Sequence, residues 1–63
     1  MEMIYNNFKG SVVFDSETKK FSGRVLNIKN SNLIYESDSM EGLIDEFQNV
    51  VDEYEALQEM LKM

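Results

Sequence analysis

One continuous apolar stripe in the second half of the sequence limits the fold more than any other feature. From residue 40 onward the apolar residues recur at intervals of three or one, which is the pattern of one face of an α-helix. The stripe consists of Met40, Leu43, Ile44, Phe47, Val50, Val51, Tyr54, Leu57, Met60 and Leu61. The sequence therefore predicts one long helix over about 39–61. Ser39 is its natural N-cap, because a serine hydroxyl accepts a hydrogen bond from the free amides of the first turn.

Three earlier segments have the β-branched and aromatic content that is typical of strands, and they span about 8–15, 21–28 and 32–37. Short polar segments over 15–20 and 29–32 separate them, which favours antiparallel pairing as a meander. The predicted fold class is α+β, a three-stranded antiparallel β-meander followed by one long C-terminal α-helix packed on one face. The whole chain is expected to form one domain.

The predicted helix is too long for the predicted sheet. At ~1.5 Å per residue it measures roughly 33 Å, so we expect its last turns to extend beyond the sheet. The face expected to receive the helix carries Val12, Phe14, Phe21, Val25, Leu33 and Tyr35. The opposite face is half apolar, and one helix cannot cover it as well. We therefore expect self-association, most simply as a dimer, through this face or the helix end, and the candidate residues are Val13, Leu26, Ile28, Ile34, Leu57 and Leu61.

Size and composition support that expectation. A chain of 63 residues without cysteine has a small core and no disulfides or thiolate metal site to stabilise it. Small domains without such constraints commonly rely on oligomerisation or a partner. No apolar run approaches the ~20 residues of a membrane span, and the first residues do not resemble a signal peptide. The expected location is cytoplasmic.

Charge is distributed unevenly along the chain. Residues 1–31 carry three acidic and five basic residues, whereas residues 32–63 carry nine acidic residues and one basic residue, Lys62. A net charge of −6 opposes direct binding of nucleic acid or an anionic membrane. The acidic half is either a solvated helix face or a surface that complements a basic protein. The candidate partner-binding residues are Glu36, Asp38, Glu41, Asp45 and Asp52.

The residue inventory argues against an enzyme. Histidine and cysteine, the commonest general base and a common nucleophile, are absent, and the three glycines form no phosphate-binding loop. Carboxylates could in principle hold magnesium, but their spacing matches no dedicated binding loop. We expect no catalytic residue, no metal site and no cofactor.

Four segments in order resemble the HicB-type antitoxin family. They are Tyr-Asn-Asn-Phe-Lys-Gly-Ser-Val-Val-Phe-Asp over 5–15, Phe-Ser-Gly-Arg-Val-Leu-Asn-Ile over 21–28, Ile-Tyr-Glu-Ser-Asp-Ser-Met-Glu-Gly-Leu over 34–43 and Phe-Gln-Asn-Val-Val-Asp-Glu-Tyr over 47–54. The first looks like that family's opening strand, the second like its next strand, the third like its approach to the helix and the fourth like its helix signature. The resemblance covers about 5–57.

The resemblance implies a truncated RNase H-like sheet that has lost catalysis. It further implies a non-catalytic inhibitor that binds and neutralises a small basic mRNA-cleaving toxin, HicA. The sequence departs from the family at Ser37 and Gly42, and it stops soon after the shared helix, where full-length relatives continue into a DNA-binding segment. The alternative is a phage- or plasmid-borne acidic decoy that inhibits a host defence nuclease or another nucleic-acid-binding protein.

Overall fold

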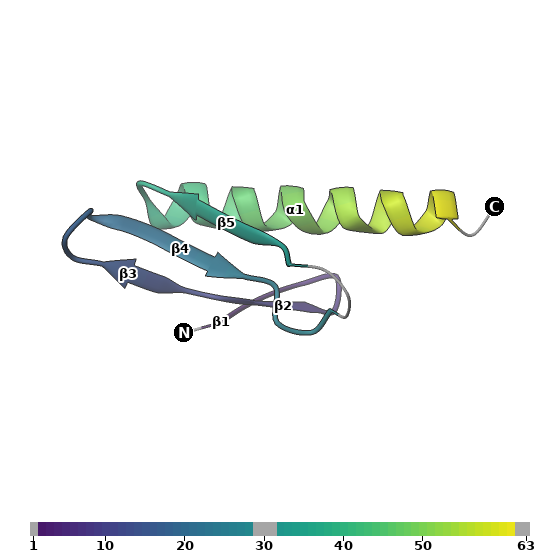
Figure 1. Ribbon diagram of the computed structural model, residues 1–63, viewed down its shortest axis with the longest axis horizontal. Helices are drawn as coiled ribbons and strands as arrows, with labels where there is room; N and C mark the ends of the chain where they lie inside the picture. The colour runs from purple at the N-terminus through teal and green to yellow at the C-terminus, as the bar shows by residue number, and fades with distance from the viewer. Residues whose placement is uncertain (1, 29–31, 62–63) are drawn as a thin grey trace.

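Five strands precede one long helix in the computed structural model, which describes residues 2–28 and 32–61 (Figure 1). The strands are β1 (Glu2–Tyr5), β2 (Phe8–Ser11), β3 (Val13–Asp15), β4 (Lys20–Arg24) and β5 (Ile34–Ser37), and the helix is α1 (Met40–Leu61). The α+β class and the helix following antiparallel strands are confirmed. The number of strands is larger than expected, and the turn predicted over 29–32 lies mostly outside the described residues.

The β1–β2 hairpin is the element that the sequence reading missed. Its connection is Asn6-Asn7, and both residues have positive φ, 50° and 70°. Two consecutive residues with positive φ form the type I′ turn, whose twist matches that of the strands it joins, and asparagine tolerates this conformation well. The two strands pair antiparallel from Glu2 opposite Ser11 to Tyr5 opposite Phe8.

A meander of β3, β4 and β5 forms the second sheet, in that order and antiparallel throughout. The predicted hairpin connection over 15–20 is confirmed, since the Lys19 amide donates to the Asp15 carbonyl at 2.7 Å. The two sheets are joined through β2 and the segment after β4, where Gly10 bridges Val25. The Leu26 amide also donates to the Lys9 carbonyl, at 2.8 Å. In space, β1 therefore lies next to β2, β2 and β3 lie end to end along the same side of β4, and β5 lies on the other side of β4.

The strand predicted over 8–15 is divided at Val12 because hydroxyl groups interrupt its ladder with β4. The Arg24 amide donates to the Ser11 Oγ at 3.0 Å rather than to a main-chain carbonyl. The Ser11 carbonyl in turn accepts from the Tyr35 hydroxyl at 2.8 Å. Two side chains thus satisfy main-chain groups that a regular ladder would have paired.

The strand predicted over 21–28 ends earlier, at Arg24, for a similar reason. The Asn27 side-chain carbonyl accepts from the Lys9 amide at 2.8 Å, and its amide group donates to the Asn7 carbonyl at 2.9 Å. These bonds pair the main chain of β2 and its turn with the Asn27 side chain in place of another main chain. The side chains after Arg24 therefore no longer alternate regularly between the two faces of the sheet. As a result Ile28 packs against the core instead of facing outward, and its predicted place on the exposed sheet face is wrong.

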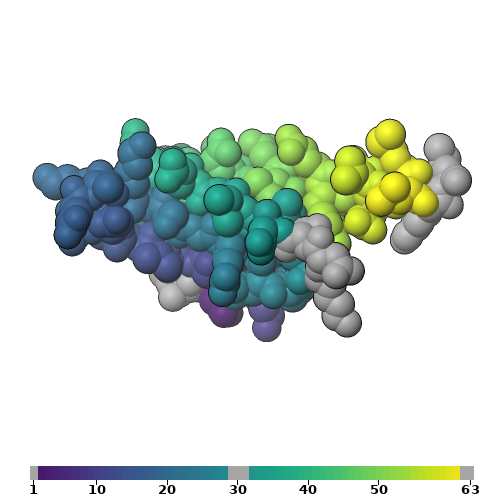
Figure 2. Space-filling model, in the orientation of Figure 1, coloured from purple at the N-terminus to yellow at the C-terminus, as the bar shows by residue number. Residues whose placement is uncertain are grey.

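The helix begins as predicted. The Ser39 Oγ accepts from the Gly42 amide at 3.0 Å, and the Ser39 carbonyl accepts the first helical bond from Leu43. The N-cap therefore satisfies one of the free amides at this end. At the other end α1 extends beyond the strands, as expected from its length (Figures 1 and 2).

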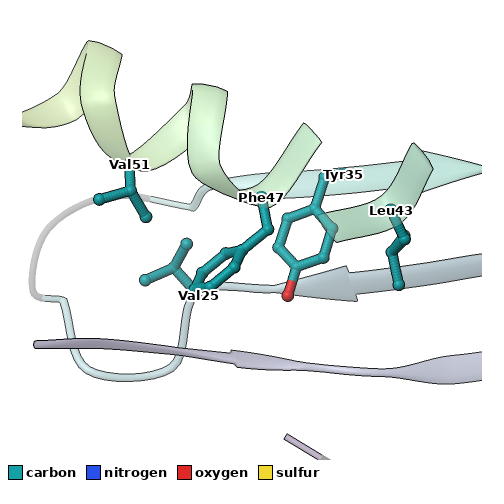
Figure 3. Packing of buried hydrophobic residues seen from close by; sticks show 5 residues of the cluster. All are labelled: Val25, Tyr35, Leu43, Phe47 and Val51. Atoms are coloured by element: carbon teal, nitrogen blue, oxygen red, sulfur yellow. The ribbon is translucent and has the colours of Figure 1, made fainter. Parts of the chain in front are cut away.

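The core is small and lies between α1 and the inner face of the sheet. Its buried residues are Val25, Tyr35, Leu43, Phe47 and Val51 (Figure 3). Phe47 is 1% exposed, and its ring centroid lies 5.4 Å from that of Tyr35. The Tyr35 hydroxyl and the Phe47 ring pass so close to Gly10 that a Cβ there would overlap both of them. Of the inner-face residues predicted from the sequence, Phe14 alone is exposed, because the β3–β4 hairpin projects past the helix start (Figure 1).

Candidate protein-interaction surface

The outer face of the sheet, opposite α1, is open in the described part of the chain. Strand alternation sends Val13 and Ile34 to this face, and Leu26 follows them just past the end of β4. These side chains are 57%, 74% and 40% exposed. They line a shallow groove of about 820 Å³, so the face presents apolar surface in a concave setting.

Charged groups also line this groove. Arg24 and Glu36 reach it from neighbouring strands, and Glu46 reaches it from the helix. None of these groove residues belongs to the ion pair found among the described residues, which joins Lys20 to Asp38 at 3.8 Å. Both side chains of that pair are largely exposed. An exposed pair of this kind contributes little to stability. The groove charges are therefore available to an incoming partner.

A second, smaller groove of about 380 Å³ lies between the start of β5 and the second half of α1. Leu33, Val50, Tyr54 and Leu57 supply most of its apolar lining, and Glu53 lies at its margin. Ile34 lines both grooves. The two grooves therefore meet at the outer edge of β5.

The helix is acidic along its length. It carries no basic residue between Met40 and Leu61, and its acidic residues are Glu41, Asp45, Glu46, Asp52, Glu53, Glu55 and Glu59. Glu46 and Glu53 are seven residues apart, which is about two helical turns, so they share the side of α1 next to β5. The sequence reading did not single out this pair, because their place beside β5 depends on how the helix is rotated against the sheet.

The five predicted partner-binding acids do not form one cluster. Glu36 lies at the outer groove, and Asp38 lies in the loop before the helix. Glu41, Asp45 and Asp52 are exposed on α1, away from the buried stripe. Within residues 2–28 and 32–61, no group of three acidic side chains is arranged to hold a metal ion.

Asp52 has a structural contact at the opposite edge of the sheet. The Tyr5 hydroxyl donates to its Oδ1 at 3.0 Å, and the Asn6 side chain donates to Glu55 at 3.0 Å. The hydrogen bond to Asp52 raises the pKa of Tyr5, because losing the phenolic proton would place two negative charges together. These bonds attach the β1–β2 turn to the helix.

The predicted self-association residues fall into two places. Val13, Leu26 and Ile34 line the outer groove together, as expected from strand alternation. Leu57 and Leu61 belong to the projecting end of α1, where Met60 is exposed beside them. Ile28 belongs to neither place, since it packs inward.

Comparison of the chain with protein-family models, curated proteins and solved structures finds no match. In the part of the chain that the structure describes, no helix has the length and apolar character needed to cross a membrane. Any assignment of function therefore depends on the surfaces described above and on the sequence resemblance.

Proposed function

We propose that this protein is a HicB-like, non-catalytic antitoxin that binds and neutralises a small basic mRNA-cleaving toxin of the HicA type. The observation that carries the proposal is that the open sheet face and the edge of β5 lie beside a side of α1 whose charged residues, Glu46 and Glu53, are acidic. The four sequence segments that resemble the HicB family support it, and so does an order of strands and helix compatible with a truncated RNase H-like sheet.

The surface chemistry fits a basic ribonuclease. A protein that binds RNA carries cationic side chains where the phosphates lie. Glu36, Glu46 and Glu53 surround exposed Ile34, so one contact would combine charge pairing with burial of apolar surface. Opposite charge would also speed the encounter and make it sensitive to salt.

Inhibition in this proposal needs no chemistry from the antitoxin. Its carboxylates are dispersed over the surface, and its sequence has no histidine or cysteine to act as base or nucleophile. The chain acts by covering the toxin's RNA-binding surface in the cytoplasm, where an mRNA-cleaving toxin works. Self-association in this proposal uses the helix end around Met60 and Leu61, and it leaves the outer groove and the main-chain edge of β5 free.

The direct test combines the purified chain with a HicA-like ribonuclease. We expect a complex in gel filtration, loss of RNA cleavage at equimolar antitoxin and rescue of toxin-arrested growth. Absence of both the complex and the rescue contradicts the proposal. Inhibition of a host defence nuclease in place of the toxin would favour the decoy alternative.

Charge variants then identify the side of the helix that binds. Glu36→Gln with Glu46→Gln removes two groove charges and should weaken toxin binding by ~10-fold or more at low salt. The matched control, Asp45→Asn with Glu59→Gln, removes the same charge from exposed helix positions outside both grooves. It should change the affinity by less than ~3-fold. Equal losses of affinity in the two variants would show that binding depends on net charge and not on the groove carboxylates.

A further inference from the structure

The outer edge of β5 is a sheet edge whose hydrogen-bonding groups can be assigned. β5 pairs with β4 on one side and with no other described strand. The Val25 amide donates to the Leu33 carbonyl at 3.0 Å, so the main-chain groups of Leu33 point toward β4. Because these groups alternate along an antiparallel strand, the N–H and C=O of Ile34 and Glu36 point outward, to the free edge.

This edge is only lightly protected against strand addition. β5 reads Ile-Tyr-Glu-Ser, so it has no lysine, proline or bulge, and its protection is limited to its short length, Glu36 and the nearby side of α1. Ile34 is 74% exposed at this edge, between the two grooves. On the other side, the edge strands are β3 and β1, and the bonds of Tyr5 and Asn6 attach the β1–β2 turn to the helix.

The charges around the edge determine which kind of strand fits it. Glu36, Glu46 and one cation, Arg24, line the groove with Ile34, and Glu53 lines the other groove, so the charge around the edge is negative on balance. A second copy of the chain pairing through β5 would place these carboxylates near their own counterparts, which is unfavourable. A strand from a basic protein would bring lysine or arginine side chains to them instead.

We propose that the free edge of β5 binds an extended strand of its basic partner by antiparallel β-augmentation, through the main-chain groups of Ile34 and Glu36. An apolar partner residue would pack on Ile34, and flanking cationic residues would pair with Glu46 and Glu53. This inference rests on the proposed function in taking the partner to be the basic ribonuclease, and it identifies the surface that this partner contacts.

Paired variants at position 34 separate the main chain from the side chain. Ile34→Pro removes the outward N–H without breaking a bond to β4, and edge positions tolerate proline. Ile34→Thr removes apolar surface but keeps the N–H. We expect Pro to weaken binding of the HicA-like ribonuclease at least ~10-fold more than Thr does, because only Pro removes a ladder donor. Equal effects of the two variants would overturn the proposal.

Folding of each variant is checked by circular dichroism and thermal unfolding. Glu36→Pro, compared with Glu36→Thr, repeats the test at the second outward amide if Ile34→Pro does not fold. Mass measurements on the free chain test the competing occupant. A dimer of free chain that Ile34→Pro dissociates and Ile34→Thr does not would assign the edge to a second copy and overturn the proposal.

A toxin-independent probe keeps this inference separate from the proposed function. An acetylated heptapeptide of alternating lysine and valine is titrated into the ¹⁵N-labelled chain and followed by amide shifts and hydrogen exchange. We expect the largest shifts and new exchange protection at the amides of Ile34 and Glu36. Shifts spread over the acidic helix without edge protection would overturn edge binding. If the peptide binds the edge but the ribonuclease does not bind the chain, edge binding stands and only the proposed identity of the partner is contradicted.

Discussion

The Tyr35 hydroxyl donates a hydrogen bond of 2.8 Å to the main-chain carbonyl of Ser11, two strands away across β4. Tyr35 reaches it by lying over Gly23, its partner in the β4–β5 register. The bond occupies the point where the ladder of β2 and β3 against β4 is interrupted. One side chain therefore connects the edge strand that we propose for partner binding to the β1–β2 hairpin.

Removing this hydroxyl should lower the stability of the domain without leaving a cavity in the core. Tyr35→Phe keeps the ring against Phe47 but leaves the Ser11 carbonyl without its donor, which costs about 1 kcal/mol of unfolding free energy. For a domain of this size the melting temperature should fall by roughly 4–8 °C. Thermal and urea unfolding measure it. Tyr54→Phe is the control, since no described group bonds to that hydroxyl, and an equal loss there would refute the role assigned to Tyr35.

Gly23 should tolerate no side chain. A Cβ at this position would overlap the Ser11 carbonyl oxygen and lie 2.9 Å from the Tyr35 ring. Because main chain cannot move aside as a flexible side chain can, Gly23→Ala should cost about 3 kcal/mol or more and leave much of the chain unfolded at 37 °C. Gly42→Ala is the comparison. Its Cβ meets mainly the rotatable Ser37 hydroxyl, so its effect should stay within about 1 kcal/mol.

Local patterns were sufficient to predict α1, since the 3.6-residue stripe and the Ser39 cap both depend on neighbours in sequence. They were insufficient for the strands. The division at Val12 depends on Tyr35, 24 residues from Ser11, and the early end of β4 depends on Asn27, 18 residues from Lys9. The β1–β2 hairpin had a local signal in Asn6-Asn7, which the sequence reading did not use.

The same distinction applies to the candidate surface. Strand alternation placed Val13 and Ile34 on the outer face, where the structure has them. Alternation failed for Ile28, because the Asn27 side chain had already ended the ladder. The place of Glu46 beside β5 depends on how the helix is rotated against the sheet, which no spacing within the helix determines.

Stability should decrease at high pH through two tyrosines. Burial raises the pKa of Tyr35, and the hydrogen bond to Asp52 raises the pKa of Tyr5, both from 10.0. A raised folded-state pKa means that the folded chain holds the proton more tightly. The contribution of each protonated tyrosine to the free energy of unfolding is therefore complete below pH 10, and it is lost as the pH rises through the tyrosine's pKa in the folded chain.

Phenolate absorbance across an alkaline titration checks this directly. Tyr5 and Tyr35 should ionise later than free tyrosine, and Tyr5→Phe should remove one late component. Asp52→Asn should lower the pKa of Tyr5 toward 10.0, because it removes the charge that opposes ionisation. Titration of both groups at the free-tyrosine value would contradict the two contacts.

Phe47 should be the most sensitive position in the core. It is 1% exposed and lies against Tyr35 and Gly10. Phe47→Ala should cost about 3–5 kcal/mol, which is comparable to the whole stability of a domain this small, so the chain should unfold. Ile44→Ala, at a position on the same helix that is 38% exposed, should cost less, about 1–2 kcal/mol. Far-ultraviolet circular dichroism distinguishes the two outcomes.

The projecting end of α1 should carry self-association. Leu57 and Leu61 are one helical turn apart and exposed, so they form an apolar strip that runs from the second groove to the end of the helix. Leu57→Glu with Leu61→Glu should lower the mass measured by light scattering to the 7.4 kDa of one chain. Its effect on folding should be small, within about 0.5 kcal/mol, because neither side chain is buried. The matched control, Asn49→Asp with Ala56→Glu, adds the same charge to exposed positions on the other side of the helix and should leave the mass unchanged. A wild-type chain that is already monomeric, or an unchanged mass in the leucine variant, would show that this end does not mediate association.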